Sequence, residues 1–246
     1  MSIPTYQIPD LKGKSIYFAS DFHLGAPDHD ASRKREDRIV SWLNQIEHDT
    51  AALFLLGDLF DFWFEYGSTI PKGNIRLQGK LAFMSDAGIP ISIFTGNHDM
   101  WMFGYFTEEM NIPIYRDLLQ LEVENTRLLI GHGDGLGPGD HTYKFLKKIF
   151  RNKFCQWLFE RLHPNTGMAI ANYWSSQSRI SNTTKGEDQY QGDDREYLVQ
   201  FCQEMEEKTH YDYYVFGHRH LPLDISISDN SRYVNLGEWV NQNTYG

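Results

Sequence analysis

The sequence predicts an α/β fold, and three observations support this prediction. Short apolar runs rich in β-branched and aromatic residues have the length of buried strands. Segments with the helical spacing of apolar residues lie between these runs. Hydrophobic residues make up 41% of the chain and aromatic residues 15%, which indicates an ordered globular protein with a sizeable core. The runs that we assign to buried strands are residues 15–19, 51–56, 89–94, 128–130 and 213–216.

The other elements are assigned in order along the chain. Ile39, Trp42, Leu43 and Ile46 share one helix face and predict a helix over residues 32–48. A turn at residues 125–127 separates two strand-like runs and predicts a hairpin. Further helices are predicted over residues 74–87, 100–110 and 193–208, with two or three more within residues 140–182. Residues 185–194 read as a polar loop, strands flank a turn at residues 229–231, and residues 237–246 are expected to form no docked element.

Five short polar blocks follow the apolar runs, and each carries side chains that bind metal ions. Glycines beside them let the backbone turn sharply and approach an ion closely. Because the strands of an α/β sheet deliver residues from their carboxyl ends into one crevice, we expect the blocks to converge. The blocks are Asp21-Phe22-His23, Gly57-Asp58-Leu59-Phe60-Asp61, Gly96-Asn97-His98-Asp99, Gly131-His132-Gly133-Asp134 and Gly217-His218-Arg219-His220.

The residue types of the blocks indicate two divalent cations. Oxygen and imidazole ligands together suit Mn²⁺, Zn²⁺ or Fe better than Ca²⁺, and Mn²⁺ is the expected metal. Asp58 is expected to bridge the two ions, because each of its carboxylate oxygens can bind one. Asp21 and His23 would point to the same side of an extended strand, and His218 and His220 repeat that spacing. Such a pair of ions supports hydrolysis of a phosphate ester or anhydride.

His98 is expected to act differently, because it directly follows Asn97 and is poorly placed to reach the same ion. We assign it as the acid that protonates the leaving oxygen or steadies the phosphoryl charge, with Asp99 as its orienting partner. For any single block, a cap, a turn or a satisfied polar side chain is the simpler interpretation. The five blocks together hold five of the ten histidines and favour a metal site.

The blocks and their order resemble the calcineurin-like metallophosphoesterase superfamily, and the resemblance covers about residues 15–240. It implies a sandwich of two mixed β-sheets flanked by helices. It also implies that His98 is the general acid or the phosphate-binding histidine. The implied ligands are Asp21, His23, Asp58 and His220 for one metal, and Asp58, Asn97, His132 and His218 for the other.

The segment between His132 and Lys185 is similar to the UDP-2,3-diacylglucosamine pyrophosphohydrolase family, the enzymes of lipid A biosynthesis. This similarity implies one domain over residues 1–246, with a helical cap over residues 137–190 whose apolar side receives two acyl chains. The residues that carry the similarity, and that would hold the diphosphate and the sugar, are Asp140, Tyr143, Ser178, Asn182 and Lys185.

Two positions depart from the best-known members of this narrower family. Those members have Arg where this chain has His98, and a second Arg where this chain has Ser175. His98 is the usual choice of the wider superfamily. A paralogue that acts on a related glycolipid or nucleotide is therefore the alternative.

Residues 144–162 combine aromatic rings with cationic side chains in an otherwise acidic protein. This composition fits an amphipathic cap that rests on a membrane surface, and the alternative is a helical insert that packs against its own neighbours. The apolar members are Phe145, Leu146, Ile149, Phe150, Phe154, Trp157, Leu158, Phe159 and Leu162, interleaved with Lys144, Lys147, Lys148, Arg151, Lys153 and Arg161.

Charge, cysteines and the N-terminus limit the possible location and partners. A net charge of −10 argues against non-specific binding to nucleic acid. Cys155 and Cys202 are far apart in the sequence and form no CxxC motif or zinc-binding spacing. They indicate reduced thiols in a cytosolic protein. No secretory signal or membrane-spanning run is visible, so we expect a cytoplasmic protein that contacts the inner face of the inner membrane peripherally.

Three functional hypotheses follow from these observations. The leading one is an enzyme that cleaves the diphosphate of UDP-2,3-diacylglucosamine to UMP and 2,3-diacylglucosamine 1-phosphate. The second is a general dinuclear phosphoesterase for nucleotides or other phosphoesters. The third is a non-catalytic scaffold of the same fold, which the complete set of expected ligands disfavours. The sequence makes no prediction of the oligomeric state.

Overall fold

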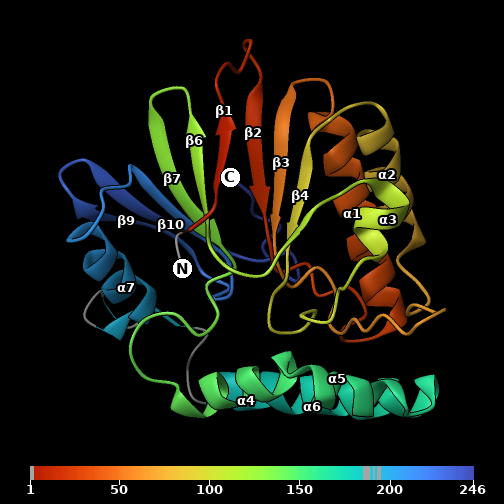
Figure 1. The fold of residues 1–246 in the computed structure, drawn as a ribbon. Helices are drawn as coiled ribbons and strands as arrows, with labels where there is room; N and C mark the ends of the chain where they lie inside the picture. Colours follow the sequence, from red (N-terminus) through yellow and green to blue (C-terminus); the bar gives the residue numbers. More distant parts are fainter. Residues whose placement is uncertain (1–2, 185–188, 191, 193–194) are drawn as a thin grey trace.

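The computed structural model describes residues 3–184, 189–190, 192 and 195–246. Two β-sheets pack against each other in the centre, helices cover their outer faces, and three helices lie across one end of the strands (Figure 1). The strands are β1 (Thr5–Ile8), β2 (Ser15–Ala19), β3 (Thr50–Leu56), β4 (Ile91–Phe94), β5 (Ile114–Tyr115), β6 (Leu119–Val123), β7 (Thr126–Gly131), β8 (Tyr213–Phe216), β9 (Pro222–Ser228) and β10 (Ser231–Leu236).

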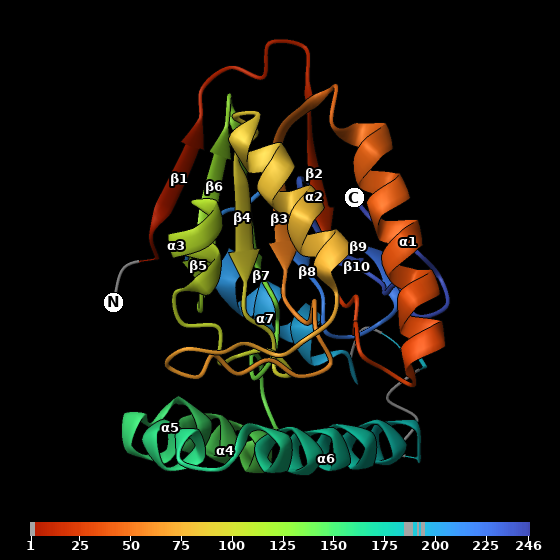
Figure 2. The same cartoon turned by 90° about the vertical axis from the view of Figure 1, so that its right-hand side faces the viewer.

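The helices separate into three groups, which Figure 2 shows from the side. One group covers the smaller sheet, a single helix covers the larger sheet, and the third group lies at the strand ends. In that order, the helices are α1 (His29–Ile46), α2 (Ile75–Asp86) and α3 (Tyr105–Met110); α7 (Tyr197–Glu206); and α4 (His141–Arg151), α5 (Lys153–Glu160) and α6 (Pro164–Thr184). We call α4, α5 and α6 the cap helices.

The two sheets differ in strand direction. The four-stranded sheet has the order β2-β3-β4-β5 and is parallel throughout, because helices connect β2 to β3, β3 to β4 and β4 to β5. The six-stranded sheet has the order β1-β6-β7-β8-β10-β9 and is mixed, with antiparallel pairs at β6–β7 and β9–β10. The fold is therefore the expected pair of packed sheets, although only the larger sheet is mixed.

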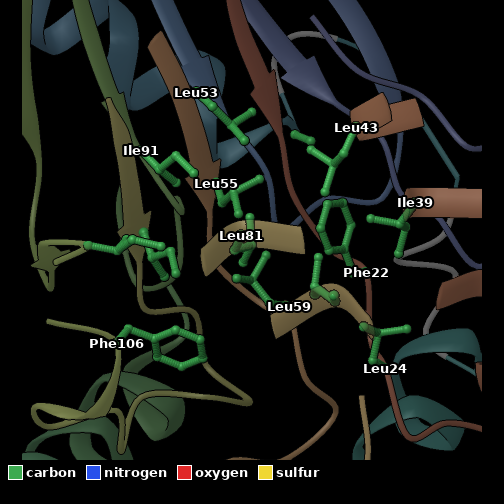
Figure 3. Packing of buried hydrophobic residues seen from close by; sticks show 14 of the residues in the cluster. Phe22, Leu24, Ile39, Leu43, Leu53, Leu55, Leu59, Leu81, Ile91 and Phe106 are labelled. Atoms are coloured by element: carbon green, nitrogen blue, oxygen red, sulfur yellow. The ribbon is translucent and has the colours of Figure 1, made fainter. Parts of the chain in front are cut away.

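Strand β3 is buried on both faces, which explains its uninterrupted apolar sequence. Leu53 and Leu55 point toward α1 and α2 and pack with residues such as Leu43 (Figure 3). Phe54 and Leu56 belong to the cluster between the two sheets. A third cluster packs α7 against the outer face of the six-stranded sheet. The three apolar layers hold the strand ends, and hence the polar blocks, in fixed positions.

Several boundaries differ from the prediction because of specific polar contacts. Helix α1 starts at His29 because Asp28 caps it, accepting a hydrogen bond of 2.8 Å from the backbone N–H of Ala31. Helix α3 starts only at Tyr105, where Glu65 accepts the backbone N–H groups of residues 104 and 105. The short strands β1 and β5 were not predicted, and residues 185–188, 191, 193 and 194 of the predicted polar loop lie outside the described residues.

The prediction for residues 237–246 is wrong. Gly246 and Phe18 exchange two backbone hydrogen bonds of 2.8 Å, so the end of the chain lies along β2. Trp239 is buried, and its ring meets the ring of Phe22 edge-on at 5.5 Å between centroids. The tail therefore forms part of the core next to the Asp21 block, although it has no regular secondary structure.

The cap helices contrast with the rest of the fold. Neither α4 nor α5 contains a buried residue. Helix α6 does bury Ala171 and Ser175 among its described side chains. Over the described part of the chain, we find no helix with the length and apolar character that crossing a membrane requires.

Candidate metal centre

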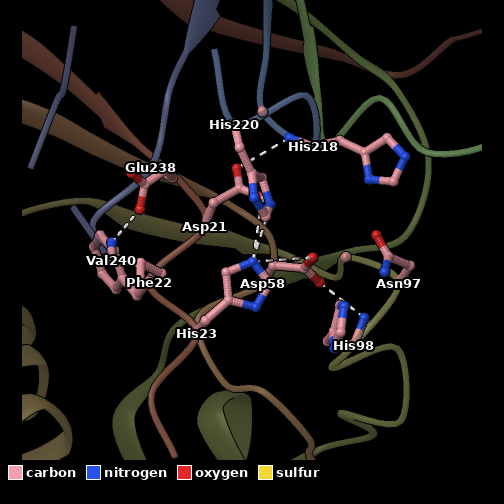
Figure 4. A network of polar contacts seen from close by, with 12 residues as sticks. Asp21, Phe22, His23, Asp58, Asn97, His98, His218, His220, Glu238 and Val240 are labelled. Carbon is pink, nitrogen blue, oxygen red and sulfur yellow. Dashed lines mark hydrogen bonds and ion pairs between the residues drawn. The ribbon is translucent and has the colours of Figure 1, made fainter. Parts of the chain in front are cut away.

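The five polar blocks meet at one end of the two sheets, in the loops that follow β2, β3, β4, β7 and β8 (Figure 4). The backbone is left-handed at Asp21 (φ 57°), His23 (φ 45°) and Asp58 (φ 53°). It is also left-handed at His218 (φ 69°) and His220 (φ 55°). The expectation that these pairs lie on extended strands is therefore wrong. They converge because strained loops turn each side chain toward a common point.

Two glycines allow the loops to approach each other closely. A Cβ at Gly96 would lie 2.2 Å from Oδ1 of Asp58, and a Cβ at Gly217 would lie 2.4 Å from Oδ2 of Asp21. Both distances are far below van der Waals contact, so a larger residue would push a carboxylate out of place. Gly96 and Gly217 thus allow one loop to pack closely against another.

The first cluster contains Asp21, His23, Asp58 and His220, whose ligand atoms lie within 4.8 Å of one another. Nε2 of His220 lies 3.1 Å from Oδ1 of Asp21. It also lies 3.1 Å from Nε2 of His23. Figure 4 shows these side chains pointing toward one another. They are the four residues that the sequence assigned to one metal.

The second cluster contains Asp58, His132 and His218, again within 4.8 Å. Nε2 of His132 lies 3.4 Å from Oδ2 of Asp58 and 3.1 Å from Oδ1 of Asn97. Asp58 is thus shared by both clusters, as expected for a bridging ligand. Its Oδ2 faces both sets, whereas its Oδ1 accepts a 2.8 Å hydrogen bond from the backbone N–H of His98. Asp58 is therefore the residue that would contact both ions.

The donor atoms fit metal ions better than they fit one another. Oδ1 of Asp21 is buried without a hydrogen-bond partner among the described residues, although His220 lies beside it. A cation bound by both residues would satisfy this oxygen and the imidazole nitrogen 3.1 Å away. Nδ1 of His132 is 2.8 Å from the carbonyl of Leu56, so in the neutral ring the N–H points there and the lone pair of Nε2 would face the cluster.

Buried carboxylates and imidazoles shift each other's pKa values. Burial opposes charge on His132, but the adjacent Asp58 outweighs it and raises the pKa of His132 to about 10. Burial likewise opposes charge on His23, but the nearby carboxylates of Asp21 and Asp61 outweigh it and raise its pKa to about 10. Burial and the charge of His132 lower the pKa of His218 to about 3. The metal-free centre therefore holds protons that arriving cations must displace.

Two buried residues that the sequence analysis did not assign to the site hold its loops. Nη1 of Arg35 donates hydrogen bonds to the carbonyls of Phe22 (3.1 Å), His23 (2.7 Å) and Ala26 (3.1 Å). Glu196 accepts a 2.8 Å hydrogen bond from Nε of Arg219, which lies between the two histidines of the last block. Arg35 is four residues before Ile39 and shares its helix face, which is the sequence signal that could have identified it.

Asp99 supports a loop and does not orient His98 as we expected. Its carboxylate accepts backbone N–H groups from Gly96 (2.7 Å), Leu59 (2.7 Å), Asp58 (3.3 Å) and Phe60 (3.3 Å). These bonds join the Asp58 and Asn97 blocks, because one carboxylate satisfies amides of both loops. Burial and the charge of Asp58 raise the pKa of Asp99 to about 7.

His98 lies at the edge of the centre. Its Nδ1 is 3.1 Å from the carbonyl oxygen of Asp61. The ring of His23 meets the His98 ring edge-on at 4.9 Å between centroids. Burial lowers the pKa of His98. His98 is thus next to the first cluster without belonging to either four-residue ligand set.

The predicted substrate-binding residues are only partly described. Asp140 caps α4 by accepting the backbone N–H of Tyr143 at 3.2 Å. The hydroxyl of Tyr143 hydrogen-bonds to Asp134, which also pairs with Lys147 of α4. Ser178 and Asn182 lie on α6, and Lys185 lies outside the described residues. Among these residues, Tyr143 reaches the cavity described next.

An apolar cavity of about 550 Å³ lies between the cap helices and the core and reaches the metal centre. Asn97 and His98 border it on the side of the centre. Aromatic and aliphatic side chains from both sides form most of its wall. The residues that line it are Asp61, Phe62, Asn97, His98, Met100, Trp101, Tyr143, Leu146, Ile149, Phe150, Phe159, Ala171, Trp174 and Ser175.

Comparison with known proteins agrees with this geometry. Residues 14–222 match the model of the calcineurin-like phosphoesterase family. The chain belongs to this family. The protein is therefore a hydrolase of the metallophosphoesterase type, with a candidate site for divalent metal ions.

Relatives of known name are similar over nearly the whole chain. A UDP-2,3-diacylglucosamine hydrolase of Porphyromonas gingivalis is 33% identical over 241 residues, covering 94% of this chain and 92% of that protein. A protein of the same name from Proteus mirabilis is 32% identical and covers 90% of each chain. Another, from Vibrio parahaemolyticus, is 26% identical and covers 92% of this chain and 90% of its own.

Proposed function

We propose that this protein hydrolyses the diphosphate of UDP-2,3-diacylglucosamine, releasing UMP and 2,3-diacylglucosamine 1-phosphate. The observation that carries this proposal is the apolar cavity, because it joins a wall suited to acyl chains to a centre suited to phosphate chemistry. The names of the relatives, which extend over 90% or more of this chain, support the same substrate.

The two clusters divide into two metal sites in this proposal. Mn²⁺ is the preferred metal, with Zn²⁺ or Fe as alternatives, because the donors are oxygens and imidazoles without a thiolate. When bound, the cations supply Lewis acidity that activates water and neutralises phosphoryl oxygens. The ligands are Asp21, His23, Asp58 and His220 for one ion, and Asp58, Asn97, His132 and His218 for the other.

His98 contacts the reacting phosphoryl group in this proposal. With its Nδ1–H directed at the carbonyl of Asp61, Nε2 is the ring atom available to the substrate. A bound diphosphate adds negative charge, which favours the imidazolium form and lets Nε2–H donate to a phosphoryl or leaving oxygen. Asp140, Tyr143, Ser178, Asn182 and Lys185 remain the proposed contacts to the diphosphate and sugar.

The cap helices, within the proposed cap of residues 137–190 of a single domain, hold the acyl chains. Cap side chains such as Phe145 (64% exposed) and Phe154 (64% exposed) face solvent beside lysines and arginines. This combination supports peripheral contact with the anionic inner face of the inner membrane, where a lipid-linked substrate would be met. The net charge of −10 supports a cytoplasmic role without nucleic acid.

A general phosphoesterase acting on nucleotides or other phosphoesters is the second candidate. The feature that favours it is the pair His98 and Ser175, at positions where the resemblance to the lipid enzymes implies two arginines. An imidazole and a hydroxyl place less fixed charge beside the diphosphate than two guanidinium groups would.

Hydrolysis of UDP-2,3-diacylglucosamine by the purified protein with Mn²⁺ tests the proposal. Asp58→Asn serves as the inactive variant, and bis-p-nitrophenyl phosphate serves as the substrate without lipid. Release of UMP that is lost in Asp58→Asn is the expected result. Turnover of the small ester alone would contradict the lipid assignment and support the second candidate.

A further inference from the structure

Helix α6 inserts the polar side chain of Ser175 into the catalytic region. Ser175 is 7% exposed, whereas its neighbours Tyr173 and Trp174 are 63% and 53% exposed. Trp174 and Ser175 both line the apolar cavity, so Ser175 lies where the cap, the cavity and the metal centre meet.

Ser175 joins a compact set of polar contacts with Asp61 and His98. Its Oγ donates a 2.8 Å hydrogen bond to Oδ2 of Asp61. The same Oγ lies 3.2 Å from Nδ1 of His98, which is itself 3.1 Å from the carbonyl oxygen of Asp61. Because the serine proton points to the carboxylate, Oγ can accept from Nδ1–H. The Nδ1 proton is thus held between two oxygens, and the Nε2 lone pair is directed elsewhere.

Asp61 extends these contacts to a proposed metal ligand. Its Oδ1 lies 3.7 Å from Nδ1 of His23, while its Oδ2 binds Ser175. The side chain of Asp61 is buried, so its hydrogen bond to Ser175 and its charge beside His23 both act away from bulk water, where such interactions are strong. A shift of α6 would therefore be felt by His98 directly and by His23 through Asp61.

We propose that Ser175 is a positioning residue through which α6 holds His98 in one tautomer and one orientation. The position of the cap helices against the core thereby sets the rate of hydrolysis at the phosphoryl group. This inference rests on the proposed role of His98 in hydrolysis. Ser175 acts through His98 and contributes to kcat, not to the affinity for the acyl chains.

Kinetics of Ser175→Ala test this role with two substrates, UDP-2,3-diacylglucosamine and bis-p-nitrophenyl phosphate. Loss of one orienting hydrogen bond should lower kcat about 3- to 10-fold on both, with KM for the lipid changed less than about twofold. Ser175→Thr keeps the hydroxyl and should recover most of the loss. Ser41→Ala, the same deletion at an exposed serine of α1, should leave both activities unchanged.

A double-mutant cycle and a spectrum separate positioning from simple packing. In a His98→Gln background, Ser175→Ala should lower kcat by less than about twofold, because its partner is gone. The imidazole ¹⁵N spectrum of the metal-free protein should show His98 protonated at Nδ1, and a mixture of tautomers in Ser175→Ala. Signals absent from His98→Gln assign the ring.

Three results would overturn the inference: an unchanged kcat in Ser175→Ala, an equal loss in both backgrounds, or a rise of KM for the lipid alone. Activity on bis-p-nitrophenyl phosphate separates the role of Ser175 from the choice of the lipid substrate. If UMP is not released but the ester shows the expected pattern, the lipid assignment fails and the positioning role of Ser175 stands.

Discussion

The metal centre and the cap helices differ in how their side chains are held. In the centre, Asp21, Asp58 and His132 are at most 4% exposed and lie on loops at one end of the two sheets. In the cap, α4 and α5 contain no buried residue, and large rings face solvent. The centre is complete before a substrate arrives, as phosphoryl chemistry requires, whereas the cap presents apolar surface that an acyl chain or a membrane would cover.

Removing the shared carboxylate should give the largest effect. Asp58→Asn takes away the oxygen that faces both clusters, so kcat on the lipid and on the small ester should fall at least about 1,000-fold. Steady-state assays with Mn²⁺ measure this loss. Asp30→Asn, at a side chain 91% exposed, is the control. A loss confined to the lipid substrate would contradict the assignment of chemistry to the metal centre and of lipid recognition to the cap helices.

Metal binding should respond strongly to pH. His23 and His132 have pKa values raised to about 10, so both are protonated in the metal-free protein at pH 7 and must lose a proton to bind. Metal affinity should therefore fall as the pH falls, by up to about tenfold per pH unit for each displaced proton. Calorimetry in buffers of different ionisation enthalpy counts these protons, and His132→Gln should release about one fewer. Binding without proton release would contradict the assigned charges.

A charge in the cavity wall should impair the lipid reaction alone. Leu146 lines the cavity, so Leu146→Asp places a carboxylate against an acyl chain and should lower kcat/KM for the lipid about tenfold. Activity on the small ester should be unchanged. Ile75→Asp is the control, since Ile75 is 72% exposed on α2, outside the cap, and does not line this cavity. Equal losses in both variants would argue against the cavity as the acyl site.

The smallest expected effect concerns the outer surface of the cap. Phe154 is 64% exposed and its ring stacks on Trp157, so Phe154→Ser should weaken binding to vesicles of anionic lipid about threefold. Sedimentation with vesicles measures this binding. Phe83→Ser on α2, outside the cap helices, where the ring is 60% exposed, should have no effect. A loss from Phe83→Ser of the same size would remove the special role of the cap.

The two regions also differ in what the sequence could predict. The blocks that hold the seven candidate ligands could be found because each block follows an apolar run, and the family resemblance selected the ligands within the blocks. The supporting contacts could not be predicted from the sequence. The carboxylate of Asp99 accepts from the amide of Leu59, forty positions away, and Arg35 of α1 donates to carbonyls of the Asp21 block. Such contacts depend on how the loops pack, which no local pattern records.

The backbone conformation of the Asp21 block and the packing of the tail could not be predicted for the same reason. Asp21 and His23 suggested an extended strand by their spacing, but both have left-handed backbones because the loop folds over that of Asp58. The tail gave no apolar period, yet Gly246 pairs with Phe18 and Trp239 is buried. Ser175 stood out only as a departure from the lipid enzymes. Its contacts with Asp61 and His98 appear once α6 is placed against the core.

UMP release from UDP-2,3-diacylglucosamine and from UDP-N-acetylglucosamine, compared under one Mn²⁺ concentration, tests the central claim most directly. Both substrates offer the same diphosphate to the metal centre, and only the first offers acyl chains to the cap. Burial of the chains predicts a kcat/KM at least about 100-fold higher for the diacylated substrate. Equal values would show that the cavity does not select the lipid and would contradict the proposed function.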